Sequence, residues 1–222
     1  MYWECAEPDT FVALFADDTS IRSRSRFFKI IKRRLETIIR KYLRYFRLWK
    51  IGTNAVKFKA IFITNRRSRQ IPTQPLRCGD VSIEWDDVGK YLGLMIDKRL
   101  TLKAHIDYAL SKALKAIRAI YSLISRRSML YTNNKIKAYK TAIRPVFTYG
   151  APIILRAVRS HIARLQRFQN KSLRMVLDIR WDADIMRYEA TTETIHSEAN
   201  IEEVETFLHR LTNKHNLRLH SG

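Results

Sequence analysis

The spacing of apolar residues changes near Asp97, and this change limits the folds that the chain can adopt. Before Asp97, most apolar residues form short runs that end at turn residues, which is typical of β-strands. Residues 27–49 are the exception, because their apolar side chains recur every three or four positions, as in an amphipathic helix. Ser25 is the expected N-cap of this helix and Gly52 its expected stop.

After Asp97, the three- to four-residue spacing dominates, so the sequence predicts an all-α region. The predicted helices span residues 104–124, 133–144, 159–177 and 201–215. The expected fold class is therefore α+β. We divide the chain into an α+β domain over residues 1–98, a basic helical domain over 99–180 and an acidic helical tail over 181–222.

Two adjacent aspartates interrupt an extended segment near the N-terminus. The apolar run 11–16 ends at Asp17 and Asp18, and an extended pattern resumes over residues 19–21. This arrangement predicts a β-hairpin that carries both carboxylates at its tip.

Further strands are expected before residue 98. The pair Gly79–Asp80 separates residues 76–78 from residues 81–83 and predicts a second hairpin. Residues 57–64 and residues 90–96 each predict a single strand.

The charge of the chain indicates a polyanionic partner. The sequence has 42 Lys and Arg residues against 21 Asp and Glu residues, a formal net charge of +21. Residues 22–69 contain one acid, Glu36, and residues 99–180 contain two, Asp107 and Asp178. Such an excess within a foldable sequence favours nucleic acid over an anionic membrane surface, since the bases alternate with core-forming residues and no lipidation motif is present.

The sequence also favours an intracellular location, in the nucleus or the cytoplasm. Its two cysteines, Cys5 and Cys78, form neither a disulfide framework nor a zinc-binding spacing. No secretory signal and no run of about 18 apolar residues is found, so no membrane partner is expected.

The aspartate pair is a candidate site for a divalent metal ion. A tight turn projects carboxylates beyond the strands, and hard cations such as Mg²⁺ bind oxygen ligands. Paired metal ions held in this way catalyse phosphoryl and nucleotidyl transfer. Solvated Asp–Asp turns are also common on protein surfaces, so the pair alone does not establish a site.

The surrounding residues resemble a known family. The segment Phe15–Asp18 is similar to the catalytic aspartate hairpin of reverse transcriptases, and above all to those of non-LTR (LINE-type) retrotransposons of the Jockey group. Residues 49–64, 88–102, 130–152 and 165–171 resemble later motifs of that group, in the same order. Five motifs in register are far more specific than one aspartate pair.

The resemblance implies a fold and an activity. It implies part of a polymerase palm, built of a β-hairpin, a helix and small antiparallel strands, followed by an all-α thumb and a C-terminal helical extension. The parent enzyme would be an RNA-directed DNA polymerase that binds an RNA template, a DNA primer or duplex, and dNTP. Mg²⁺ or Mn²⁺ is expected only in the complete active site.

The resemblance also implies roles for individual residues. Asp17 would bind the metal, and Asp18 would be a weaker ligand or its neighbour. Phe15 would lie beside the primer terminus. Lys57 would protonate or neutralise pyrophosphate, although an ordinary surface lysine explains it equally well.

Three residues of the predicted strand 90–96 match the family's primer grip. By this match, Tyr91, Leu92 and Gly93 would position the primer backbone. A glycine suits close approach of another backbone, and it equally suits a bulge in the strand.

The basic residues near the predicted thumb form a candidate nucleic-acid surface. They would neutralise phosphates with little sequence preference, while some of them serve only solubility. The candidates are Lys112, Lys115, Arg118, Arg126, Arg127, Lys135, Lys137 and Lys140.

Parts of the family's active site have no counterpart in the sequence. In the family, the fingers, an upstream palm aspartate and a nucleotide-gating loop precede the aspartate hairpin, and here ten residues precede Phe11. We therefore expect the chain alone to be inactive, with an upstream fingers and palm fragment as a possible partner. A non-catalytic basic nucleic-acid-binding module and a decayed reading frame are the alternatives.

Overall fold

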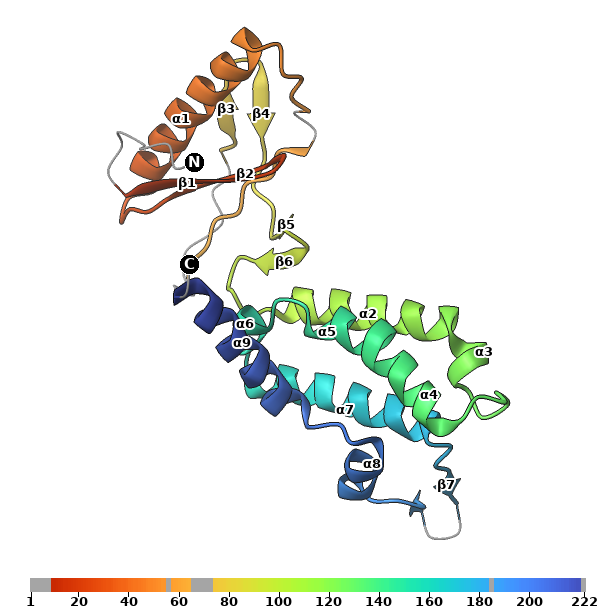
Figure 1. Ribbon diagram of the computed structural model, residues 1–222. Helices are drawn as coiled ribbons and strands as arrows, with labels where there is room; N and C mark the ends of the chain where they lie inside the picture. The colour runs from red at the N-terminus through yellow and green to blue at the C-terminus, as the bar shows by residue number, and fades with distance from the viewer. Residues whose placement is uncertain (1–8, 55–56, 65–73, 184–185, 221–222) are drawn as a thin grey trace. The chain divides into compact units, whose positions relative to one another are not determined.

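The computed structural model describes residues 9–54, 57–64, 74–183 and 186–220. The chain divides into two compact units, residues 1–100 and residues 101–222. Helices and small antiparallel hairpins occur together (Figure 1), which confirms the α+β expectation in its coarse form. The assignment of these parts to a palm and a thumb stays a prediction.

The first unit begins with the predicted hairpin and helix. Strands β1 (Thr10–Phe15) and β2 (Asp18–Ser23) pair antiparallel, and helix α1 covers Phe28–Leu48. Both ends of the helix differ from the prediction. The N-cap residue is Phe27, whose backbone N–H donates to Ser25 Oγ at 3.2 Å, and the chain leaves the helix through Lys50 with φ of 53°, before Gly52.

Two further hairpins follow in the same unit. Strands β3 (Leu76–Cys78) and β4 (Val81–Ile83) confirm the predicted pair. The single strand predicted over 90–96 is wrong, because the segment folds into two strands, β5 (Val88–Tyr91) and β6 (Leu94–Asp97). Leu92 and Gly93 form the turn between them with φ of 46° and 78°, which is the backbone that a two-residue hairpin loop requires.

The strand predicted over residues 57–64 is also wrong. The segment makes only an isolated bridge, from Ala60 to Trp85, within the described residues. It packs instead through its side chains, because Phe62, Phe28 of α1 and Trp85 form edge-on ring contacts with centroids 5.7–6.1 Å apart. Among these rings, Trp85 packs against the small core of the first unit, which contains Leu76 of β3.

The second unit is helical apart from one short hairpin (Figure 1). Its elements are α2 (Lys103–Ala119), α3 (Tyr121–Ile124), α4 (Thr132–Ala138), the π-helical turn η2 (Tyr139–Ile143), α5 (Arg144–Thr148), α6 (Ala151–Ile154), α7 (Arg159–Val176), β7 (Trp181–Asp182), β8 (Arg187–Tyr188), α8 (Thr192–Ala199) and α9 (Val204–His220).

The helices differ from the predicted ones mainly at their interruptions. The helix expected over 104–124 breaks at Ile120, and the helix expected over 133–144 continues beyond Pro145 into α5. The backbone widens into the π-helical turn directly before Pro145, which has no N–H to close an α-helical turn. Helix α8 and the β7–β8 hairpin were not predicted.

The core of the second unit draws on both ends of its sequence. Ile106 of α2, Phe147 of α5 and Leu165 of α7 are fully buried together with Ile195 of α8 and Leu208 of α9. The C-terminal helices α8 and α9 are thus part of the same core as the basic helices. No helix in the described part of the chain is both long and apolar enough to cross a bilayer.

The β3–β4 turn offers a clean test of the backbone. Gly79 has a positive φ of +66°, whereas the φ of Gly52 lies outside the left-handed region. No atom lies within 4 Å of a Cβ added at either glycine. We expect Gly79→Ala to lower the free energy of unfolding by about 1 kcal/mol, because an alanine is strained at positive φ. Gly52→Ala, measured alongside by chemical denaturation, is expected to be neutral. Equal effects of the two changes would contradict this account.

Candidate catalytic hairpin and nucleic-acid interface

The aspartate pair lies where the sequence predicts it, at the tip of the β1–β2 hairpin. Phe15 and Asp18 form the last pair of the ladder, so Ala16 and Asp17 make a two-residue turn. Ala16 takes the left-handed conformation with φ of 51°. Both aspartates are exposed, which leaves their carboxylates accessible to a ligand.

The two faces of the hairpin have different environments. The face with Val12 is turned inward, since Val12 is 4% exposed and β2 packs beside α1. Because cross-strand partners share a face, Asp18 lies on the opposite face with Phe15 and, further along, with Phe11 and Arg22. Phe11 and Phe15 are 47% and 63% exposed. One carboxylate and an uncovered aromatic surface therefore share the outer face of the hairpin.

The hairpin supplies two carboxylates. Within the described residues, no three His, Cys, Asp or Glu side chains gather to hold a metal ion. Asp9, the acid nearest to the pair along this hairpin, lies at its open end, roughly 20 Å away by strand rise. A metal pair 3.5–4 Å apart takes bridging and flanking ligands that two adjacent side chains do not provide alone.

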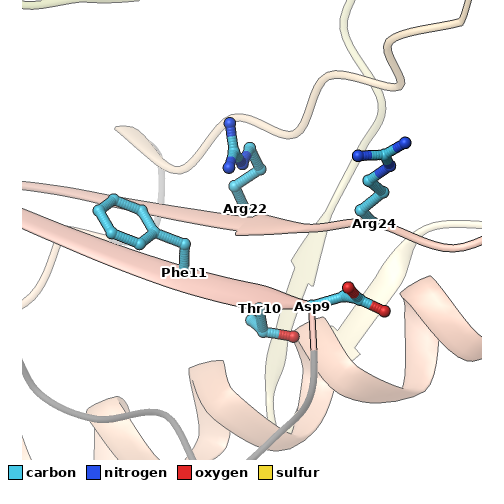
Figure 2. A pocket seen from close by; sticks show the side chains of 5 residues that line it. All are labelled: Asp9, Thr10, Phe11, Arg22 and Arg24. Carbon is cyan, nitrogen blue, oxygen red and sulfur yellow. The ribbon is translucent and has the colours of Figure 1, made fainter.

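A basic hollow lies at that open end of the hairpin. Asp9, Thr10, Phe11, Arg22 and Arg24 line a volume of about 220 Å³ (Figure 2). The Arg22 guanidinium lies 5.8 Å from the Phe11 ring centroid, and the Arg24 N–H donates to the Asp9 carbonyl at 3.0 Å. This hollow lies at the opposite end of the hairpin from the aspartate pair.

The other residues that the family resemblance selected lie on different local structures. Lys57 is exposed and its backbone N–H donates to the Asn54 carbonyl at 3.1 Å. Tyr91 ends β5, while Leu92 and Gly93 form the following turn. Gly93 is thus required by its positive φ, and the expectation of a bulge within one continuous strand is wrong.

Helix α2 carries the predicted row of bases. Lys112, Lys115 and Arg118 are exposed on its outer side, and the Lys112 ammonium lies 5.4 Å from the Tyr108 ring centroid. Lys115 and Arg118 make no ion pair among the residues that the structure describes. Arg127 and Lys137 are likewise exposed, beyond the C-terminus of α3 and on α4.

The two acids of the basic segment 99–180 are both held in ion pairs with arginines of the same segment. Asp107 of α2 pairs with Arg164 of α7, and Asp178, directly after α7, pairs with Arg126 at 3.5 Å. Each acid is thereby neutralised by its own arginine. The other bases of this segment keep their positive charge uncompensated by any acid within it.

Helix α7, which packs beside α2, adds a row that the sequence reasoning missed. Arg159, Arg167 and Lys171 are exposed on α7. Their separations of eight and four residues place them on one side of a helix, and this spacing was the available signal. Two adjacent helices therefore both present bases to solvent.

Two of the predicted contact residues donate hydrogen bonds to backbone carbonyls of the protein itself. Lys135 is 7% exposed, and its ammonium donates to the Ser125 carbonyl at 3.0 Å. The Lys140 ammonium donates to the Asn200 carbonyl at 3.0 Å. Both lysines hold the chain together here, and we leave them out of the proposed phosphate contacts.

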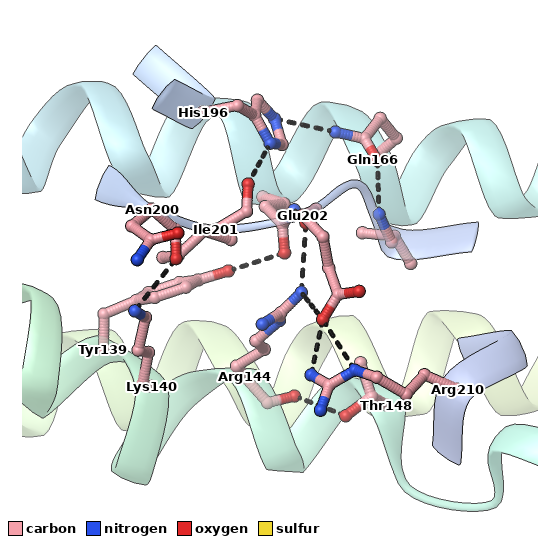
Figure 3. A network of polar contacts seen from close by, with 12 residues as sticks. Tyr139, Lys140, Arg144, Thr148, Gln166, His196, Asn200, Ile201, Glu202 and Arg210 are labelled. Atoms are coloured by element: carbon pink, nitrogen blue, oxygen red, sulfur yellow. Dashed lines mark hydrogen bonds and ion pairs between the residues drawn. The ribbon is translucent and has the colours of Figure 1, made fainter. Parts of the chain in front are cut away.

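A buried polar network joins helix α7 and the π-helical turn to the segment before α9 (Figure 3). The Tyr139 hydroxyl donates to Gln169 Oε1 at 3.1 Å, and Gln169 Nε2 donates to the Glu202 carbonyl at 2.9 Å. Burial raises the pKa of Tyr139 above its ordinary value, which keeps this hydroxyl a donor. Tyr139 and Gln169 lie in segments that resemble family motifs, but sequence reasoning gave neither residue a role in the fold.

Arg144 completes the network. Its Nη2 donates to the Glu202 carbonyl at 3.0 Å, and its guanidinium carbon lies 3.5 Å from the Phe207 ring centroid. Burial lowers the pKa of Arg144 from its ordinary value, while Tyr139 and Glu202 oppose that shift. Arg144 is 6% exposed, so it acts within the fold.

Comparison with known proteins confirms the resemblance drawn from the motifs. The chain is 31% identical over 172 residues to a probable RNA-directed DNA polymerase from transposon X-element of Drosophila melanogaster, covering 78% of this chain and 19% of the relative. The polymerases of mobile element jockey and transposon BS of the same species are 26% and 24% identical, over 80% and 98% of this chain.

The matched part is a small share of each relative. The chain spans about a fifth of their length, 19% of the jockey polymerase and 23% of the BS polymerase. No family model matches the chain, and no solved structure matches it.

Proposed function

Because the chain is related in sequence to part of the RNA-directed DNA polymerases of non-LTR retrotransposons, we propose that it is a nucleic-acid-binding segment of such a polymerase. In this proposal, the basic helices of the second unit bind the backbone of the template–primer, and the aspartate turn of the first unit supplies metal ligands.

One observation carries the binding part of the proposal. Helices α2 and α7 pack side by side, both present exposed bases, and the acids of residues 99–180 are already paired with arginines. Phosphate-binding surfaces need positive charge that internal ion pairs do not neutralise. Two neighbouring rows of bases can contact more phosphates of a nucleic-acid backbone than a single row can.

The catalytic part of the proposal concerns metal ions. Asp17 and Asp18 would hold Mg²⁺ or Mn²⁺ beside a primer 3′-hydroxyl, as metal-dependent nucleotidyl transfer requires. The described residues gather no third ligand, so we propose that the chain alone does not extend a primer. The same observation favours the second candidate, a nucleic-acid-binding module without catalysis.

Binding to RNA–DNA duplex is expected to depend on both helices. Arg118→Gln combined with Lys171→Gln removes one base from α2 and one from α7. We expect the affinity at about 0.15 M salt to fall roughly tenfold or more, and the slope of log affinity against log salt to become shallower by about two. Fluorescence anisotropy across a salt series measures both quantities.

A matched control separates surface from total charge. Arg187→Gln combined with Lys214→Gln removes the same net charge from exposed positions of the C-terminal region. We expect this variant to bind within about twofold of the wild type. Equal losses in both double variants would show that only net charge matters, and absence of saturable binding by the wild type would refute the proposed function.

A further inference from the structure

The loop between α3 and α4 exposes apolar side chains to an unusual degree. Met129 is 99% exposed and Tyr131 is 83% exposed, the two highest values among large hydrophobic side chains in the described part of the chain. The Tyr131 ring makes no aromatic or cation–π contact within those described residues. Leu130, between Met129 and Tyr131, is 38% exposed, and contiguous exposed apolar groups, unlike single ones, mark interaction sites.

The loop is held in place by hydrogen bonds. The Ser128 N–H donates to the Ser125 carbonyl at 3.0 Å, and the Leu130 N–H donates to Ser128 Oγ at 3.1 Å. The Tyr131 carbonyl accepts the Asn134 N–H at 2.9 Å, at the start of α4. The buried Lys135 ammonium anchors the base of the loop at the Ser125 carbonyl. Met129 and Tyr131 are therefore presented by a fixed backbone.

The loop also lies within strongly basic sequence. Arg127 precedes Met129 and Lys137 follows on α4, both exposed, while the neighbouring Arg126 is paired with Asp178. An occupant of this surface must combine negative charge with flat apolar faces. Nucleotides in an unpaired strand do so, because their bases stack on aromatic rings while their phosphates meet basic groups. In a duplex the base faces are already covered.

We propose that the α3–α4 loop, residues 125–131, binds an unpaired nucleic-acid strand. Tyr131 stacks on one base, Met129 packs against the neighbouring nucleotide, and Arg127 contacts a phosphate. The inference rests on the proposed function, since it adds a single-strand site to a chain already proposed to bind nucleic acid. It differs from the α2 and α7 rows, which contact phosphates of either form.

The test compares two probes on the full chain. One probe is a 20-nucleotide single-stranded RNA and the other is the same RNA paired with its complement. We expect Tyr131→Ala to weaken single-strand binding by at least roughly fivefold, the loss of one stacked base. Duplex binding should change less than twofold. Tyr131→Phe keeps the ring and should bind as the wild type does.

Further variants make each outcome decisive. Phe27→Ala removes another aromatic that is 67% exposed, in the first unit, and should leave both affinities unchanged. Unchanged single-strand binding by Tyr131→Ala, or an equal loss for both probes, overturns the inference while the proposed function stands. Failure of the wild type to bind either probe would contradict both this inference and the proposed function. Tyr131-dependent pelleting with anionic vesicles, with no effect on RNA binding, would assign the loop to a membrane surface and overturn the inference.

Discussion

Asp17→Ala is expected to lower primer extension at least roughly 10³-fold in a fusion protein that supplies the further metal ligand. The fusion joins the segment that precedes the matched region in the X-element polymerase to this chain. Loss of a ligand removes several kcal/mol of stabilisation from the charge that develops during nucleotidyl transfer. Incorporation of labelled dNTP on an RNA template with Mg²⁺ or Mn²⁺ measures the effect. Asp18→Ala is expected to cost less.

The β3–β4 turn provides the matched control for this prediction. Asp80 is also an exposed aspartate in a two-residue hairpin turn, so Asp80→Ala should leave incorporation unchanged. The melting temperature of Asp17→Ala should equal that of the wild type, because Asp17 is solvent-exposed. Incorporation by the unfused chain that Asp17→Ala abolishes would refute the proposal that the chain alone is inactive. Undiminished incorporation by the Asp17→Ala fusion would remove Asp17 from the catalytic site.

Arg144→Ala is expected to lower the free energy of unfolding of the second unit by about 3 kcal/mol. The change removes a charged donor from the Glu202 carbonyl, worth roughly 1.5–3 kcal/mol. It also removes the side chain that covers the Phe207 ring, which leaves a gap in a close-packed region. Urea denaturation followed by circular dichroism measures the loss.

Arg210 is a stringent control because it contacts the same residue. Its guanidinium pairs with the Glu202 carboxylate, but its side chain is 63% exposed. A surface ion pair contributes at most about 1 kcal/mol, so Arg210→Ala should cost far less than Arg144→Ala. Equal losses would show that burial of Arg144 adds nothing and that the network in Figure 3 is not a stabilising unit.

Elements whose signals are contiguous in sequence were predicted well. The β1–β2 hairpin, the β3–β4 hairpin and helix α1 follow from turn residues and apolar spacing within one segment. Local pattern and local backbone preference agree in these places. The aspartate pair was located correctly for the same reason, since its position depends only on where two adjacent strands end.

The β5–β6 hairpin shows where such reasoning fails. Residues 90–96 are largely apolar and contain no polar turn pair, so the sequence predicted one strand. The turn depends on positive φ at Leu92 and Gly93, and a leucine gives no sign of that conformation. The sequence left close backbone approach and a bulge as the alternatives for Gly93; the structure shows a turn in place of the bulge, and the role at the primer stays a prediction.

The buried bases show a second limit. Charge counting treats Lys135 and Arg144 as surface residues, yet both are under 10% exposed. Their acceptors are backbone carbonyls, at Ser125 and at Glu202, which lies 58 residues from Arg144 in sequence. Every residue has a backbone carbonyl, so the sequence does not show which carbonyl accepts a hydrogen bond. Such partners become visible only once the chain is folded.

The place of Glu202 has a consequence for damaged copies of the gene. Its carbonyl receives hydrogen bonds from Gln169 and Arg144, and Val204 and Leu208 beyond it are fully buried. A premature stop codon or frameshift ahead of Glu202 would expose the interior of the second unit. It would also leave Arg144 without the Glu202 carbonyl as an acceptor. The reading frame must therefore extend into α9 for the basic helices α2 and α7 to have their complete core.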